Sequence, residues 1–228
     1  MPNLIHFPIS QPVRAVRWFI RRHGIEGITE TELTLKQFSK GVEESPYGAV
    51  PALVLDDASV LTESAAILAY ISAQYKKGEE EFPKDPLGQA RVMEALLHHN
   101  ELSRLITLDV IRPLFGRMLN PTGTTYEQLT AKFEEKREHL TWVLKLVDTL
   151  LSKQKWIAGN TVTIADYLVI CELNQVPLLE SVLPEYLHFC NYPNIAAYLE
   201  SAKTLSGYEF SVAPWTTVVP GLLKAGSP

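Results

Sequence analysis

Residues 49–71 read AVPALVLDDASVLTESAAILAYI, and this stretch decides the fold of the chain around it. The apolar run after Pro51 predicts a strand, the Asp56-Asp57 pair predicts a turn, and the residues after it predict a second strand. Polar residues 62–64 then precede a run of Ala, Ile and Leu that predicts a helix. The stretch therefore predicts a strand, a hairpin turn, a second strand and a helix in direct succession.

Two features of this stretch can carry chemistry. Val50-Pro51 is a candidate cis peptide, since an X-Pro bond costs only about 0.5–1 kcal/mol to hold cis, and such a turn can direct the backbone of Val50 to a ligand. Glu63 and Ser64 stand at a helix start, where unpaired N–H groups and the dipole favour anions. Together they could hold an extended peptide. On local grounds alone, a helix cap at Thr62 or Ser64, a Glu63 that only complements the helix dipole and a proline that starts a strand explain the same residues.

Composition limits the class of protein. The chain has 228 residues and a net charge of −5, which argues against a nucleic-acid partner. No apolar run approaches the roughly 20 residues that span a bilayer, and the N-terminus does not resemble a secretory signal, so we expect a soluble cytoplasmic protein with no membrane contact. Cys171 and Cys190 are the only cysteines. They suggest neither a disulfide framework nor a zinc site; a single disulfide remains an alternative to two buried thiols.

The first 80 residues predict a small mixed sheet. Residues 4–7 form a strand candidate, and a helix follows with Ser10 at the N-cap and Pro12 in its first turn, ending near residues 23–24. Residues 30–35 predict a second strand, and residues 36–41 a short connecting segment. A right-handed crossover makes the first two strands parallel, and the hairpin adds an antiparallel pair.

After residue 86 the chain predicts helices alone. Residues 76–86 form a polar linker with two prolines, at which we expect a domain boundary. Helical spacing runs over residues 87–118 and again over 133–151, and residues 193–205 predict a last helix. Thr163 and Asp166 form a capping box that begins another helix, so we expect Asp166 to be structural rather than catalytic.

The order Val-Pro-Ala-Leu at 50–53, Leu-Thr-Glu-Ser at 61–64 and the following helix resembles the glutathione-binding half of glutathione transferases. The resemblance extends over nearly the whole chain. It implies an α/β plus all-α fold: a thioredoxin-like domain with a mixed four-stranded sheet (residues 1–78), followed by an all-helical domain (residues 87–228). Ser10-Gln11-Pro12 resembles the theta class in particular, in which a serine activates the thiol.

Elementary chemistry explains what Ser10 would do. A free thiol has a pKa near 8.5, so little of it is thiolate at pH 7. A hydroxyl that donates to the sulfur at a helix N-terminus favours the thiolate, and lowering the pKa by about two units needs roughly 2.7 kcal/mol. A plain N-cap is the alternative for Ser10 if the residue is judged by itself.

The family resemblance also implies the binding residues. The backbone of Val50, which precedes Pro51, meets the cysteinyl part of glutathione, while Glu63 meets the γ-glutamyl amine and Ser64 its carboxylate. Further expected contacts come from Gln11, Lys36, Gln37 and Arg104. Ala49 stands where the family often has lysine, and the absence of that lysine would weaken glutathione binding. The electrophile pocket is expected between the domains, with candidates Ile9, His98, Leu105, Leu108, Ile111, Phe115 and Trp215, although helical spacing alone makes most of these core or interface residues.

The resulting hypothesis is a theta-like glutathione transferase that conjugates glutathione to hydrophobic electrophiles or reduces organic hydroperoxides. Glutathione is the co-substrate, and neither a metal nor a prosthetic group is expected. We also expect a homodimer. The main alternative is a non-catalytic glutathione-binding or scaffold protein of the same fold, which Ala49 favours. A thiol-disulfide oxidoreductase is the weaker third option, because no cysteine stands at position 10.

Overall fold

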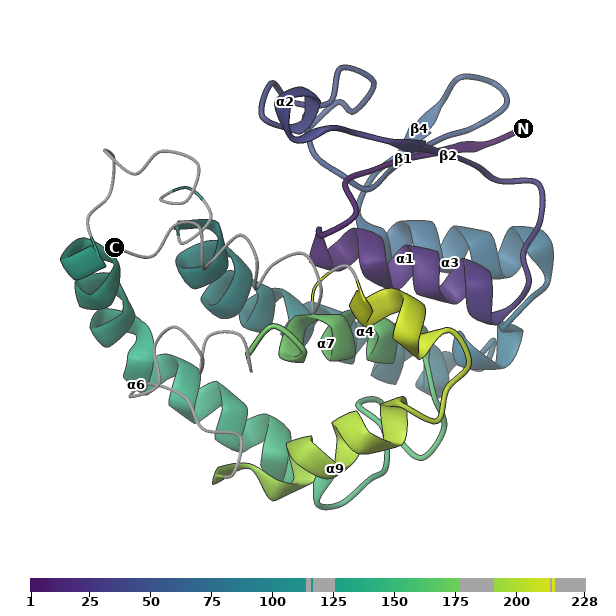
Figure 1. Ribbon diagram of the computed structural model, residues 1–228. Helices are drawn as coiled ribbons and strands as arrows, with labels where there is room; N and C mark the ends of the chain where they lie inside the picture. The colour runs from purple at the N-terminus through teal and green to yellow at the C-terminus, as the bar shows by residue number, and fades with distance from the viewer. Residues whose placement is uncertain (114–115, 117–125, 177–190, 214, 216–228) are drawn as a thin grey trace.

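A computed structural model of the chain describes residues 1–113, 116, 126–176, 191–213 and 215. Figure 1 shows a small sheet above the first helices, with the remaining helices gathered below them. The expected order of a sheet-containing part followed by a helical part is confirmed.

The sheet has four strands in the order β2-β1-β3-β4. These are β1 (Asn3–His6), β2 (Thr29–Glu32), β3 (Ala52–Val54) and β4 (Val60–Leu61). As predicted, β1 pairs parallel with β2 and the β3–β4 hairpin is antiparallel. β1 also pairs antiparallel with β3, which places it in the interior of the sheet. The second strand begins and ends earlier than the predicted residues 30–35, because Thr34 already caps the next helix.

Helices α1 (Gln11–Arg22) and α3 (Ser64–Tyr75) lie beside each other under the sheet, and α2 (Leu35–Phe38) lies away from them (Figure 1). The start of α1 agrees with the prediction, since Pro12 lies in its first turn. The connecting segment predicted at residues 36–41 is the short helix α2, which begins one residue earlier and is held by a capping box between Thr34 and Gln37.

The polar connection contains a short 3₁₀ helix, η1 (Glu79–Glu81), and ends at α4 (Pro86–Ser103). Asp85 caps α4, because its Oδ1 accepts a hydrogen bond from Gly88 N at 2.7 Å. α4 continues without a break into a π-helical stretch, η2 (Arg104–Ile111). The sequence predicted the helix here but not its π-helical winding.

The second part of the chain also contains α6 (Tyr126–Leu151), α7 (Ile164–Leu173) and α9 (Pro193–Ala202), and residues 208–213 are helical as well. Every residue of α7 is buried. Asp166, in its first turn, is structural as expected: it accepts hydrogen bonds from Ile157 N (2.9 Å), Thr163 N (2.8 Å) and Tyr198 Oη (2.8 Å). Burial raises the pKa of this carboxyl to about 6, against the opposing effect of its hydrogen bonds.

One hydrophobic core extends through both parts of the chain. α1 packs on α7, where the Trp18 ring meets the Tyr167 ring edge-on with a centroid distance of 4.8 Å, and Phe19 meets the same tyrosine at 5.4 Å. Trp18 Nε1 also donates to Ser206 O at 2.9 Å, beyond α9. α1 is therefore buried between the sheet and the helical part.

Candidate active site

The register of the sheet brings the predicted site segments to one end of it. Ile5 of β1 pairs with Ala52 of β3, so the chain leaving β1 passes beside the Val50-Pro51 turn. Leu53 pairs with Leu61, so the residues after β4 leave at the same end. β2 runs parallel to β1, and its end is followed by α2. The loops after β1, β2 and β4 and the turn before β3 therefore share one edge of the sheet.

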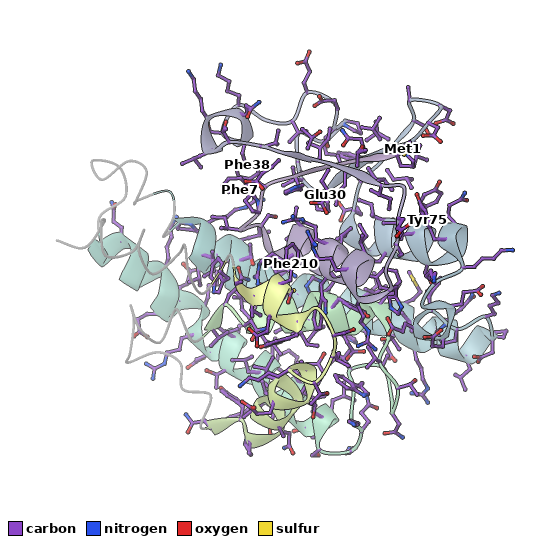
Figure 2. The ribbon with its side chains drawn as sticks, turned by 45° about the vertical axis from the view of Figure 1, so that its right-hand side comes forward. Met1, Phe7, Glu30, Phe38, Tyr75 and Phe210 are labelled. Carbon is purple, nitrogen blue, oxygen red and sulfur yellow. The ribbon has the colours of Figure 1, made fainter. Side chains whose placement is uncertain are left out.

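An aromatic contact joins two of these loops. The rings of Phe7 and Phe38 are stacked, with a centroid distance of 4.6 Å and an angle of 7° between their planes, and Figure 2 shows the two side chains together. Phe7 follows β1 and Phe38 ends α2. The contact thus fixes α2 beside the segment that leads to Ser10.

Ser10 is the N-cap residue of α1, with an extended backbone (φ −63°, ψ 124°). Its N–H donates to Phe7 O at 3.0 Å, and its carbonyl accepts from Arg14 N at 3.0 Å. Its side chain makes no capping hydrogen bond to the first turn of the helix. Ser10 therefore has the position of an N-cap, while its half-buried hydroxyl is not used as one.

The Val50–Pro51 peptide bond is cis, as predicted. Pro51 is buried and Val50 is half-buried at the start of β3.

Glu63 and Ser64 begin α3 with unusual backbone geometry. Glu63 has φ +65° and ψ 112°, in a region that costs a non-glycine residue on the order of 1–3 kcal/mol and is concentrated at functional sites. Its carbonyl accepts from Ile67 N at 3.0 Å, but its exposed carboxylate makes no capping hydrogen bond. Ser64 is buried in the first turn. The N-cap residue is thus Glu63 itself, and neither Thr62 nor Ser64, the two capping candidates, holds that position.

Gln11 is placed differently from the expectation. Its side chain is 3% exposed, and its Nε2 donates to Leu168 O of α7 at 2.9 Å and lies 3.2 Å from His99 Nε2 of α4. The side chain thus turns into the interface with the helical part and away from the edge where a peptide would bind. No sequence signal distinguishes this orientation, because it depends on residues almost 90 and 160 positions away.

The remaining expected glutathione contacts are surface residues with local roles. Gln37 Oε1 accepts from Thr34 N at 2.9 Å within the capping box, and Lys36 is exposed beside it. Arg104 is exposed on η2, where its Nη2 donates to Glu101 Oε1 at 2.6 Å. α2 lies at the edge that carries the other predicted residues, whereas no described contact joins Arg104 to that edge.

The expected electrophile residues differ in their burial. Ile9 is half-buried next to Ser10, Leu108 is exposed on η2, and Leu105 and Ile111 belong to the core. Trp215 is 3% exposed, with its ring 5.3 Å from the guanidinium carbon of Arg14. Phe115 lies outside the described residues.

His98 lines a separate pocket of about 310 Å³ between α4 and α6, together with Trp142 and Leu146. Every residue that lines this pocket belongs to the helical part.

The described residues contain no group of three or more His, Cys, Asp or Glu side chains that could hold a metal ion. Cys171 is a buried free thiol, and burial raises its pKa to about 11. Cys190 lies outside the described residues, so the alternative of a disulfide stays a prediction. Across residues 1–113, 126–176 and 191–213, no helix is long and apolar enough to cross a membrane.

Comparisons with known proteins agree with this architecture. Residues 4–80 match the family model for the glutathione S-transferase N-terminal domain, and residues 106–203 match the model for the C-terminal domain. The chain is 31% identical over 229 residues to glutathione S-transferase theta-2 of Mus musculus, covering 95% of this chain and 86% of that protein. It is 32% identical over 185 residues to glutathione S-transferase T1 of Arabidopsis thaliana, covering 75% and 71% of the two chains.

Among solved structures, a delta-class glutathione transferase of Nilaparvata lugens superimposes over the full length of both chains with a TM-score of 0.79 at 24% identity, which shows the shared fold. The sheet edge with its cis-proline, the helical part that follows it and the theta-class relatives lead to one conclusion: this chain belongs to the glutathione S-transferase family.

Proposed function

We propose that this chain transfers the thiolate of glutathione to hydrophobic electrophiles and that Ser10 stabilises the thiolate. The observation that carries the proposal is the Ser10 hydroxyl, which stands at the N-terminus of α1 without a capping hydrogen bond. A hydroxyl in this position can donate to a sulfur anion, and the helix N-terminus favours the same charge. Reduction of organic hydroperoxides is a second reaction that the same thiolate supports.

Glutathione is the proposed co-substrate, with no prosthetic group. We propose that the Val50-Pro51 turn holds its cysteinyl backbone, that Glu63 meets the γ-glutamyl amine and that Ser64 meets the γ-glutamyl carboxylate. Their common position at one sheet edge supports this assignment. Lys36 and Gln37 on α2 are candidates for the glycyl carboxylate. The orientation of the Gln11 side chain into the domain interface argues against a direct ligand role for that residue.

The test is a pH titration of the thiolate absorbance of bound glutathione in the wild type, Ser10→Ala and Ser64→Ala. We expect a wild-type thiol pKa about two units below 8.5, which returns toward 8.5 in Ser10→Ala and lowers the thiolate fraction at pH 7 roughly 20- to 30-fold. Ser64→Ala is the matched control, because it should raise the KM for glutathione and leave the thiol pKa unchanged. An unaltered thiol pKa in Ser10→Ala would remove Ser10 from the mechanism.

A non-catalytic glutathione-binding protein is the second candidate, and Ala49 favours it. This exposed residue offers no cation beside the Val50-Pro51 turn. Glutathione binding with an ordinary thiol pKa and without turnover on any electrophile would support this alternative.

We propose a homodimer as the working form, with a cytoplasmic location and a domain boundary in the connection between α3 and α4. Large apolar side chains are exposed on α4 and α6, among them Leu97 (65%), Trp142 (58%) and Leu146 (50%), and such surfaces commonly mark interfaces. Light scattering at micromolar protein should give twice the chain mass of 25.6 kDa. A monomeric mass would contradict the proposed dimer.

A further inference from the structure

A chain of buried polar side chains begins next to Ser10 and crosses into the helical domain. Its first member is Gln11, the first residue of α1, whose Nε2 lies between Leu168 O (2.9 Å) and His99 Nε2 (3.2 Å). Gln11 is 3% exposed and His99 5% exposed. A buried amide held at this position fixes the first turn of the helix against α4 and α7.

The chain continues from His99 to Glu172 of α7, which is fully buried. One carboxylate oxygen of Glu172, Oε1, accepts hydrogen bonds from Thr107 Oγ1 at 2.6 Å and Gln175 Nε2 at 2.9 Å. The other oxygen, Oε2, accepts no hydrogen bond and lies 3.7 Å from His99 Nε2. Leaving a buried carboxylate oxygen without a hydrogen bond destabilises the folded state, so the His99 imidazole beside it is its candidate partner.

The single nitrogen His99 Nε2 faces two partners with opposite requirements. When Nε2 carries a lone pair, it accepts from the Gln11 amide. When Nε2 carries a proton, it pairs with Glu172, and the Gln11 amide must present its oxygen instead. Glu172 and Gln11 therefore compete for the same nitrogen of His99. Arg14 of α1 adds a buried positive charge to this interface, with its Nη2 donating to Cys171 O at 2.9 Å.

We propose that Glu172 and His99 are positioning residues, which act through Gln11 to hold Ser10 in the geometry that stabilises the thiolate. This inference rests on the proposed role of Ser10. Because the Ser10 side chain makes no capping hydrogen bond, its placement depends on the backbone of the adjacent turn, and the Gln11 side chain anchors that turn. The helical domain thus contributes to the activation of the thiol through residues that do not touch glutathione.

A second buried carboxylate supplies a matched control at the other end of α1. Glu81 of η1 is 2% exposed: its Oε1 accepts from Arg22 Nη2 (3.1 Å), and its Oε2 accepts from Tyr167 Oη (2.6 Å) and lies 3.0 Å from His23 Nε2. Like Glu172, it contacts a histidine and joins α1 to the helical domain. It lies at the end of α1 remote from Ser10, so its loss should affect stability alone.

The experiment compares Glu172→Gln, His99→Leu, Glu81→Gln and Ser10→Ala in the full chain, with the thiol pKa of bound glutathione, the KM for glutathione and the Tm measured for each. In Glu172→Gln an amide donor replaces Oε2 and competes with Gln11 for His99. We expect the bound-thiol pKa to rise by about 0.5–1 unit and KM to change less than twofold. At pH values below the pKa, this rise lowers the thiolate fraction about three- to tenfold. His99→Leu should give the same rise, and Glu81→Gln should lower the Tm without any rise.

Two results would overturn the inference, and they are distinguishable. If Ser10→Ala raises the bound-thiol pKa while Glu172→Gln and His99→Leu do not, Ser10 is the activating residue and the buried chain is only structural. If Ser10→Ala leaves the thiol pKa unchanged, the proposed role of Ser10 fails, and the positioning role fails with it. If Glu172→Gln does not fold, His99→Leu alone decides between these outcomes.

Discussion

At the scale of single residues, the site is marked by polar side chains that stand at helix starts and do not cap them. Ser10 precedes α1, Glu63 precedes α3, and neither side chain makes a capping hydrogen bond. Glu63 also keeps a positive φ that glycine would adopt at lower cost. A carboxylate at a position that favours glycine is consistent with the binding role proposed for Glu63.

Replacing Glu63 should separate its backbone strain from its binding role. Glu63→Gly and Glu63→Ala both remove the carboxylate, and loss of a charge-assisted hydrogen bond of about 1.5–3 kcal/mol should raise the KM for glutathione by roughly 10-fold or more. Only the glycine variant relieves the positive φ, so its Tm should exceed that of the alanine variant. Ala58→Gly in the β3–β4 hairpin, where φ is +64°, is the control: it should raise the Tm and leave KM unchanged. An unchanged KM in both Glu63 variants would contradict the binding role.

Glu30 should make stability depend on pH in the acid range. Its interaction with buried His6 (3.5 Å) and its hydrogen bonds with Arg17 (2.7 and 3.0 Å) lower the pKa of this carboxyl from 4.5 to about 2. The folded state therefore binds the proton more weakly than the unfolded chain, and the stabilisation is complete above pH 4.5 and is lost as the pH falls through about 2. Glu30→Gln should flatten this part of the profile in urea denaturation from pH 5 to 2. Glu32→Gln, exposed on the same strand, should not; equal profiles for both variants would exclude the effect.

At the scale of elements, α1 is the helix that joins the two parts of the molecule, because the sheet covers one of its sides and the helical part covers the other. Its face toward the sheet was predictable from its apolar spacing, and its start was predictable from Ser10 and Pro12. Its second buried side was not, since Trp18 and Arg14 meet residues of α7 and of the segment after α9 that are more than 140 positions away. The π-helical winding of η2 likewise has no local signal, although it carries Thr107, which reaches Glu172.

Gly207 shows how closely the segment after α9 approaches α1. Its φ is +79°, and a Cβ at this position would lie 3.1 Å from Trp18 Cδ1. Gly207→Ala should therefore cost about 2–4 kcal/mol, from left-handed strain together with overpacking. Gly27→Ala is the matched control: its φ is +84° with nothing within 4 Å of the added Cβ, and it should cost only about 1–2 kcal/mol. Equal urea midpoints for the two variants would contradict a tight contact with Trp18.

At the scale of the whole molecule, two domains share one core. Trp18 of the first domain and Tyr167 of the second belong to the same cluster of buried residues. We therefore expect urea unfolding to be a single transition, with coincident curves from far-UV circular dichroism, which follows mainly the helical domain, and from the fluorescence of a Trp142→Phe, Trp156→Phe and Trp215→Phe variant, which follows Trp18 of the first domain. Separate midpoints for the two signals would show that the domains unfold independently.

The sequence allowed the fold and the sheet edge to be predicted because their signals are local. The Val-Pro pair, the polar break at Glu63-Ser64 and the serine before Pro12 each stand within a few residues of the element they define. Contacts between distant segments were not predictable. Gln11 turns toward α7, His98 lines a pocket between α4 and α6, and Trp215 lies against Arg14, because contacts between segments far apart in the sequence decide each orientation.

The burial of α1 between two domains has a consequence for the design of chimaeric enzymes. The sheet edge supplies the proposed nucleophile site, and the helical domain is where a new electrophile specificity would be introduced. Since Gln11, Arg14 and Trp18 all reach into α7 or beyond it, a helical domain grafted from a relative would replace the partners of the helix that follows Ser10. Exchanging the helical domain to alter substrate specificity would therefore also change the reactivity of the site at the sheet edge.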